Sequence, residues 1–121
     1  MVTHQTIGER GGVLTSEDLA ALRDDLHEQR LFREEQLRQL AADPTPLADG
    51  PRGAGRIEVR VKLAASARMV LADVEAALTR MDTGTYGTCH LCRRPIQRER
   101  LLIVPQARYC ARCQQVREAS R

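Results

Sequence analysis

The stretch that decides the fold is residues 89–113, CHLCRRPIQRERLLIVPQARYCARC, because it contains every cysteine of the 121-residue chain. The four form two Cys-x-x-Cys pairs, Cys89 with Cys92 and Cys110 with Cys113, separated by seventeen residues. A two-residue spacer brings both thiolates of a pair into one tight turn, and two such turns supply the four sulfur ligands that tetrahedral Zn²⁺ prefers. The pattern therefore predicts one structural zinc ion, with no ligand position left open for a substrate water.

Two other arrangements also use four cysteines. Two disulfides require an oxidising compartment, but the N-terminal sequence, MVTHQTIGERGG, lacks the charged start and apolar core of an export signal. An iron–sulfur cluster is also held by four thiolates, but the paired spacing fits a zinc ribbon better. His90 lies inside the first turn and is expected to be a solvent-facing spacer, because the four cysteines already complete a zinc site.

The sequence before the cysteines predicts a helical hairpin. Thr15 or Ser16 can cap a first helix over about residues 16–42, whose first turn is acidic. Residues 43–55 contain three Pro and three Gly and are expected to form a tip loop, with a second helix over about 56–82. Two such helices pack antiparallel as a rod roughly 40 Å long, at 1.5 Å per residue.

The facing stripe of the first helix is apolar at both ends and polar in the middle. Leu19, Leu22 and Leu26 are followed by Gln29, Arg33 and Gln36, and then by Leu37 and Leu40. The second helix has an apolar face from Leu63 to Met81. Residues 57–61 alternate like a strand, but a helix is favoured because a lone strand would have no partner.

The expected fold is mainly α, an antiparallel helical hairpin (coiled coil) with a C-terminal four-cysteine zinc ribbon and a short terminal helix. Residues 1–14 are expected to form a flexible arm, residues 15–84 the hairpin and residues 85–121 the zinc-finger module. The terminal helix is expected over Gln114–Ser120, where its positive N-terminal end favours the thiolates of the second pair. Arg93 follows the first pair where ribbon turns often have Gly for its positive φ, at a cost of about 1 kcal/mol.

Composition and charge narrow the possible functions. The three aromatic residues provide no platform for stacking bases, and no run approaches the roughly 20 apolar residues of a membrane span. A soluble, cytoplasmic protein is therefore expected. Residues 90–121 carry eight Arg and two Glu, a net charge of +6, which leaves −3 for residues 1–89 of the total of +3. The basic module could contact nucleic acid or an acidic protein surface.

The order of motifs around the cysteines resembles the DksA/TraR family of bacterial transcription regulators. The motifs are Tyr86-Gly87-Thr88 before the first pair, then Pro95-Ile96, Arg100-Leu101 and Pro105, and Gln114 directly after the second pair. The resemblance covers about residues 15–121. It implies a coiled-coil hairpin on a zinc-ribbon base that enters the secondary channel of RNA polymerase, binds the polymerase rather than DNA, and alters initiation.

The resemblance also implies a role for the hairpin tip, where family members carry acidic residues close to the catalytic magnesium of the polymerase. A gapless count back from Cys89 places the second of the family's two tip aspartates at Asp49 and the first at Pro46. Asp49 is therefore the expected main tip residue, with Asp43 nearby as a second carboxylate. Asp-Gly is also a common turn sequence, so Asp49 could serve turn geometry, function or both.

Some family members contribute basic residues to a site for guanosine tetraphosphate (ppGpp). The same gapless count places Asp73, Val104 and Gln114 at those positions, and none of the three is basic. Phosphate groups are bound most strongly by cationic donors. The chain is therefore expected not to form this site with the polymerase.

Two other functions stay open. A zinc ribbon that binds nucleic acid would contact phosphates with Arg93, Arg94, Arg98, Arg100 and Arg108, the same residues that could meet a polymerase. A structural adaptor would pair through its hairpin into a homodimer, whereas the polymerase hypothesis implies a monomer. No phosphate-binding loop, nucleophile elbow or His-Glu metal motif occurs, so a non-enzyme is expected.

Overall fold

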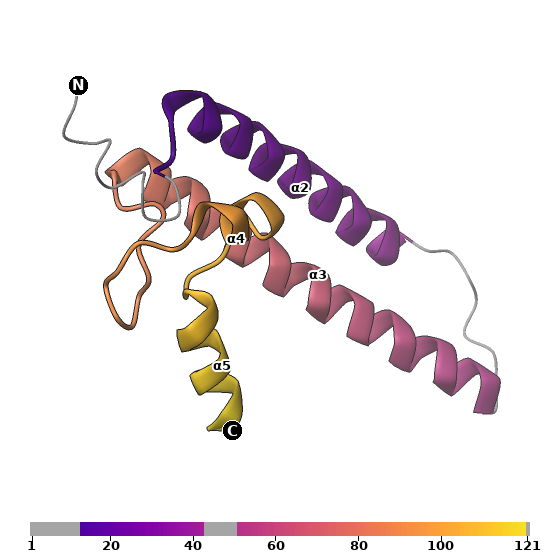
Figure 1. Cartoon of the computed structure of the whole chain (residues 1–121). Helices are drawn as coiled ribbons and strands as arrows, with labels where there is room; N and C mark the ends of the chain where they lie inside the picture. The colour runs from indigo at the N-terminus through magenta and orange to yellow at the C-terminus, as the bar shows by residue number, and fades with distance from the viewer. Residues whose placement is uncertain (1–12, 43–50, 121) are drawn as a thin grey trace.

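The computed structural model describes residues 13–42 and 51–120, and only the backbone of residues 51–54. Within this part of the chain lie four helices, α2 (Ser16–Ala42), α3 (Pro51–Thr83), α4 (Arg98–Ile103) and α5 (Ala111–Ala119). Helices α2 and α3 run antiparallel and side by side, while the two short helices and their loops lie at the end where α2 begins (Figure 1). The fold is the predicted helical hairpin with a four-cysteine module at its base.

Helix α2 begins with a reciprocal cap formed by Thr15 and Asp18. The sequence alone allowed either Thr15 or Ser16 as the capping residue. The Thr15 hydroxyl accepts a hydrogen bond from the Asp18 backbone N–H at 2.9 Å, and the Asp18 carboxylate accepts one from the Thr15 N–H at 3.0 Å. This pattern is a capping box in which Asp takes the place of the usual Glu or Gln. Thr15 is therefore the cap, and Ser16 is the first helical residue.

The second helix begins earlier than the sequence predicts. Residues 51–55, expected to belong to the tip loop, form the start of α3 at Pro51 rather than at residue 56. Proline is tolerated in the first turn because the N–H groups there have no partner within the helix. The glycines that follow lower helix propensity by about 1 kcal/mol each, but the helix they begin is 33 residues long. The strand-like residues 57–61 are helical, as predicted.

The core of the hairpin lies at its base. Leu26 of α2 packs with Val74, Ala77 and Leu78 of α3, and Leu26, Val74 and Ala77 are fully buried. The small alanine side chain lets the two helix backbones approach closely at this end. Toward the tip, Ile57 and Val61 are 39% and 62% exposed, respectively. The two apolar ends of the predicted seam thus differ, because only the end at the base is closed.

A second core cluster joins the base of the hairpin to the four-cysteine module. Its buried residues are Leu22, Cys89, Ile96, Leu101 and Ala107. Leu14, which was expected to belong to a flexible arm, packs against this cluster. The expected arm is therefore too long by at least this residue, and residues 1–12 lie outside the described part of the chain.

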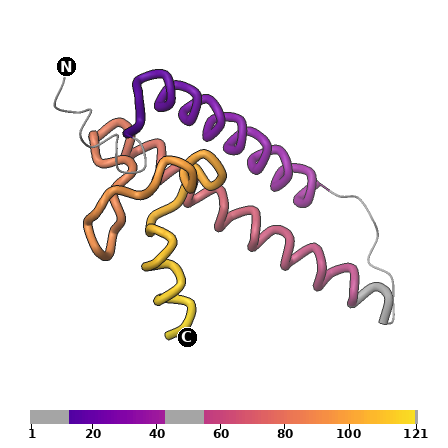
Figure 2. Tube along the Cα trace, in the orientation of Figure 1, coloured from indigo at the N-terminus to yellow at the C-terminus, as the bar shows by residue number. Residues whose placement is uncertain are grey.

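The four-cysteine module is built mainly from turns. In its described residues, 85–120, the only β-pairing is one isolated antiparallel bridge between Thr88 and Pro95, so the expected ribbon is reduced to this bridge. The tube in Figure 2 follows the path of the module from the end of α3 through α4 into α5. Among the described residues, no helix is both long and apolar enough to cross a membrane.

Candidate metal centre

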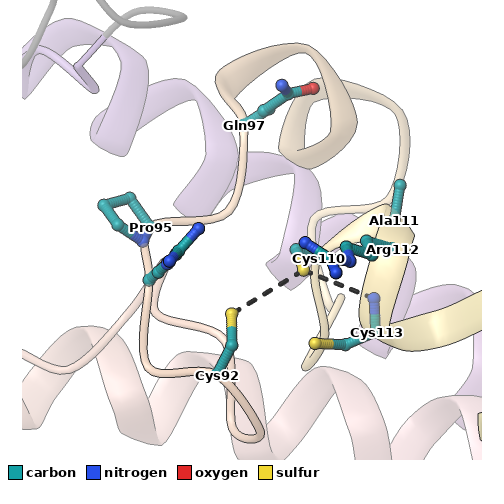
Figure 3. Close-up of a pocket in the computed structure, with 8 residues that line it drawn as sticks. Cys92, Pro95, Gln97, Cys110, Ala111, Arg112 and Cys113 are labelled. Carbon is teal, nitrogen blue, oxygen red and sulfur yellow. Dashed lines mark hydrogen bonds between the residues drawn. The ribbon is translucent and has the colours of Figure 1, made fainter. Parts of the chain in front are cut away.

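The four cysteines come together as the sequence predicts. Their Sγ atoms all lie within 4.8 Å of one another, and those of Cys92 and Cys110 are 3.9 Å apart. Four sulfurs placed tetrahedrally about 2.3 Å from a Zn²⁺ ion would be separated by roughly 3.8 Å. In Figure 3 the sulfurs of Cys92, Cys110 and Cys113 face a common space. The donor set and its spacing therefore fit a structural zinc ion.

The first cysteine pair is held by a tight turn after Cys89. The Cys89 sulfur accepts the backbone N–H of Leu91 at 3.4 Å, and the Cys89 carbonyl accepts that of Arg93 at 3.1 Å. Arg93 has a φ of 64°, the only positive φ outside glycine among the described residues. The turn therefore requires the left-handed conformation expected at this position, which costs an arginine about 1 kcal/mol.

The second cysteine pair is positioned by helix α5. This helix begins at Ala111, three residues before the predicted start at Gln114, and Cys110 is its N-cap. The Cys110 sulfur accepts the N–H of Cys113 at 3.4 Å, as a capping oxygen would. Both cysteines of the second pair thus lie at the N-terminal end of α5.

A backbone hydrogen bond connects the two turns. The N–H of His90 donates to the carbonyl of Arg108 at 2.9 Å, just before the second pair. The His90 side chain is exposed and lies edge-on to Tyr109, with ring centroids 6.1 Å apart. His90 is not part of the cluster of four possible ligands, which agrees with its predicted role as a spacer.

The thiols affect one another electrostatically. Burial opposes ionisation of Cys89, but hydrogen bonds from the backbone of Cys92, Cys110 and Leu91 outweigh it and lower its pKa to about 6. For Cys113, the hydrogen bond with the Cys110 side chain and burial raise the pKa to about 12. Four sulfurs at this distance cannot all carry a negative charge without a cation among them. A divalent ion compensates those charges, which is a second reason why the site suits Zn²⁺.

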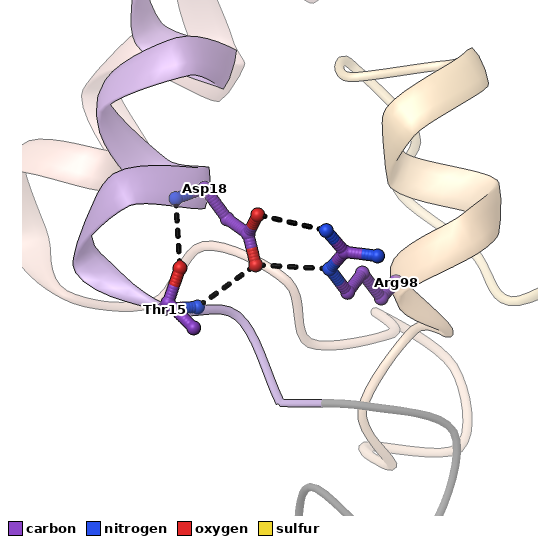
Figure 4. Close-up of polar contacts among 3 residues, drawn as sticks. All are labelled: Thr15, Asp18 and Arg98. Atoms are coloured by element: carbon purple, nitrogen blue, oxygen red, sulfur yellow. Dashed lines mark hydrogen bonds and ion pairs between the residues drawn. The ribbon is translucent and has the colours of Figure 1, made fainter.

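The module is fastened to the start of α2 by a two-pronged ion pair. Arg98, the first residue of α4, donates to both carboxylate oxygens of Asp18, at 2.9 and 3.0 Å (Figure 4). The hydrogen bond from Arg98, and next that from the Thr15 backbone, hold the pKa of Asp18 well below its usual range. A carboxylate that caps a helix and also binds a guanidinium fixes the angle at which α4 meets the hairpin.

Further contacts fasten the module to α3 and to its own loops. Asp73 of α3 forms an ion pair with Arg108 at 3.0 Å, and Arg80 of α3 donates to the Ala107 carbonyl at 3.4 Å. The Tyr86 hydroxyl donates to the Pro105 carbonyl at 2.8 Å. Burial raises the pKa of Tyr86 to about 12.

Three of the five arginines predicted to contact a partner take part in contacts within the chain. Arg98 binds Asp18, Arg108 binds Asp73, and Arg100 donates to the Tyr109 carbonyl at 2.9 Å. Arg93 and Arg94 are exposed beside the first cysteine pair. An intermolecular role stays a prediction for all five, and it applies most directly to these two. The predicted tip residues Asp43 and Asp49 lie outside the described residues.

The chain has relatives among known proteins. Residues 84–119 match the model of the prokaryotic dksA/traR C4-type zinc finger. An uncharacterized protein of Aquifex aeolicus (strain VF5) is 42% identical over 43 residues, which are 36% of this chain and 30% of that protein. The chain thus matches less than a third of the length of this curated relative.

Two solved structures share the fold over nearly the whole chain. The transcription factor DksA2 from Pseudomonas aeruginosa superimposes with a TM-score of 0.71 and 24% identity, covering 98% of both chains. The DnaK suppressor protein from Agrobacterium tumefaciens C58 gives a TM-score of 0.62 with 27% identity, covering 88% of this chain and 96% of its own. With its cluster of four cysteines, which fits one structural zinc ion, below a helical hairpin, the chain is similar to the DksA/TraR family in its zinc finger and in its fold.

Proposed function

We propose that this protein is a transcription regulator that binds bacterial RNA polymerase through the secondary channel and modulates initiation without binding DNA specifically. The observation that carries the proposal is the match to the transcription factor DksA2 over 98% of both chains, hairpin included. A match confined to the zinc finger would be compatible with many functions, whereas the hairpin is the part that a channel would admit.

The dimensions of the hairpin support this proposal. Helix α3 has 33 residues, which at 1.5 Å per residue corresponds to roughly 50 Å. The four-cysteine module is fastened to the base of this rod through Arg98, Arg108 and Arg80, so the two parts would act as one body. A rod on a fixed base suits insertion into a pore, with Asp49 and Asp43 in the segment that connects α2 to α3.

Specific DNA binding is not part of the proposal. Of the five arginines that could contact phosphates, Arg98, Arg100 and Arg108 have partners within the chain. Arg93 and Arg94 would provide too few phosphate contacts for strong, salt-dependent binding to DNA alone. A zinc site filled by four cysteines also offers no open coordination position for catalysis, so we propose a non-enzymatic regulator that acts in the cytoplasm as a monomer.

We also propose that the complex with polymerase lacks the family's ppGpp site. Asp73 is acidic and paired with Arg108, Val104 packs against the core, and Gln114 donates to the Glu118 carboxylate at 2.8 Å. None of these side chains could neutralise a phosphate. In a competition assay with radiolabelled tetraphosphate, adding the protein to polymerase should leave binding unchanged, and a tightening of binding would contradict this part of the proposal.

Photo-crosslinking tests entry into the channel. A photo-reactive amino acid in place of Asp49 should crosslink to the largest polymerase subunits near the active centre, and a Gre-type factor in excess should suppress the crosslink. The same group in place of Glu118, on α5 of the module, is the matched control and should not reach the active centre. Equal crosslinking from both positions, or no suppression by the Gre-type factor, would argue against binding through the secondary channel.

A further inference from the structure

Between the two long helices, toward the tip, lies a groove that the described residues leave open. It has a volume of about 610 Å³. Leu37 and Leu40 of α2 form one apolar wall, and Ile57 and Val61 of α3 form the other. These residues belong to the distal apolar end of the seam, where Ile57 and Val61 are partly exposed and burial along α3 becomes complete only at Ala67.

The size and spacing of this distal groove suit a helix. On α3 the apolar lining recurs at Ile57, Val61 and Ala64, which is the spacing with which one helix face meets another. From Ile57 to Arg68 the groove follows α3 for roughly 16 Å, about three helical turns.

Charge distinguishes the possible occupants. The charged residues that line the groove are Arg38, Arg60 and Arg68, with no Asp or Glu among them in the described part of the chain. Arg38 is paired with Glu35 at 2.7 Å, but both side chains are more than half exposed, so this pair is weak and leaves the rim basic.

We infer that the distal groove is a docking site for an acidic amphipathic helix of a partner protein, with apolar side chains at i, i+3, i+4 and i+7 and carboxylates along its edges. Such a helix would bury Ile57 and Val61 and place its carboxylates beside Arg68 and Arg38. A second copy of this chain fits less well, because it would bring the same arginine-lined rim to the groove. This inference does not depend on the proposed polymerase binding.

The test uses the full, zinc-loaded chain and two fluorescein-labelled peptides of about 14 residues, roughly four helical turns. Both peptides carry the same leucine stripe, and their remaining positions are Glu in one and Lys in the other. Fluorescence anisotropy should detect binding of the acidic peptide, about tenfold or more tighter than the basic one, with a difference that shrinks as salt rises. Equal binding of both, or no binding of the acidic peptide, would overturn the inference.

The chain offers matched control variants. Val61 lines the groove and is 62% exposed, whereas Val59 is 57% exposed and lies outside it. Val61→Glu should weaken acidic-peptide binding by about tenfold or more, because it places a like charge in the apolar wall, and Val59→Glu should change it by about twofold or less. For charge, Arg68→Glu should weaken binding and Lys62→Glu, outside the lining, should do so far less.

Circular dichroism and sedimentation complete the experiment. Both valines are exposed, so Val61→Glu and Val59→Glu should retain the helical spectrum of the parent chain, and any difference in peptide binding then reports on the groove. Equal loss of binding in the two variants would overturn the inference. So would sedimentation of the parent chain as a dimer that Val61→Glu dissociates, because the occupant would then be a second copy of the chain.

Discussion

The clearest energetic prediction compares two leucines of α2 that face the same seam. Leu26 is fully buried against Val74, Ala77 and Leu78, whereas Leu37 lines the open groove. Leu26→Ala removes three carbon atoms worth about 0.8 kcal/mol each and leaves a cavity, so the expected loss in the free energy of unfolding is about 3 kcal/mol. Leu37→Ala removes the same atoms from a side chain that already meets water, and leaves no closed cavity, so the loss should be about 1 kcal/mol.

Urea unfolding at saturating zinc, followed by circular dichroism, measures this difference. At a slope of roughly 1.5 kcal/mol per molar urea, a gap of about 2 kcal/mol separates the two midpoints by about 1.3 M. Leu31→Ala is the control, because Leu31 is 59% exposed on the same helix and should change stability by less than about 0.5 kcal/mol. Equal losses for Leu26→Ala and Leu37→Ala would mean that the distal seam is packed as tightly as the base, and the reasoning about the groove would fail.

Three further predictions concern the four-cysteine module and its attachment. Cys113→Ser should abolish stoichiometric zinc binding, while α2 and α3 keep most of their helicity because they have their own core cluster. Metal analysis and circular dichroism measure the two effects, and an unchanged zinc content would contradict the prediction. Burial raises the pKa of Tyr86 from 10.0 to about 12, so Tyr86 ionises first in the unfolded chain, and the free energy of unfolding should fall as pH rises from about 10 to about 12. Tyr86→Phe should lack this part of the loss. Identical pH profiles of stability for the two proteins would show that Tyr86 is not its cause. Arg93→Gly should relieve the cost of a positive φ and stabilise the module by up to about 1 kcal/mol, whereas Arg94→Gly should not. In thermal melts at saturating zinc, Arg93→Gly should therefore melt at a higher temperature than Arg94→Gly.

The metal centre was predictable from sequence because its geometry is local. Each Cys-x-x-Cys pair fixes its own turn, so the spacing alone indicated four converging sulfurs, and the structure brings them within 4.8 Å. The positive φ of Arg93 follows from the same turn. The first helix was also predictable, because a cap at Thr15 and a proline-rich segment after Ala42 mark its two ends.

Other features depend on contacts between distant parts of the chain. Asp18 and Arg98 are 80 residues apart, and no spacing rule links them, so the sequence alone indicates only that Arg98 is a candidate for contacts with a partner. The start of α3 at Pro51 was missed because proline and glycine are helix breakers in a helix interior, whereas proline is tolerated at the first helical position. The open distal groove was missed because a repeating apolar pattern indicates which residues face a partner helix but not whether the helices close on each other.

Retention of bacterial core RNA polymerase by the immobilised, zinc-loaded chain is the most direct test of the proposed function. If the protein binds through the secondary channel, core polymerase should be retained at micromolar concentration and released by a Gre-type factor in excess. Naked DNA should not release it. Failure to retain the polymerase, or release by DNA but not by the Gre-type factor, would contradict the proposal.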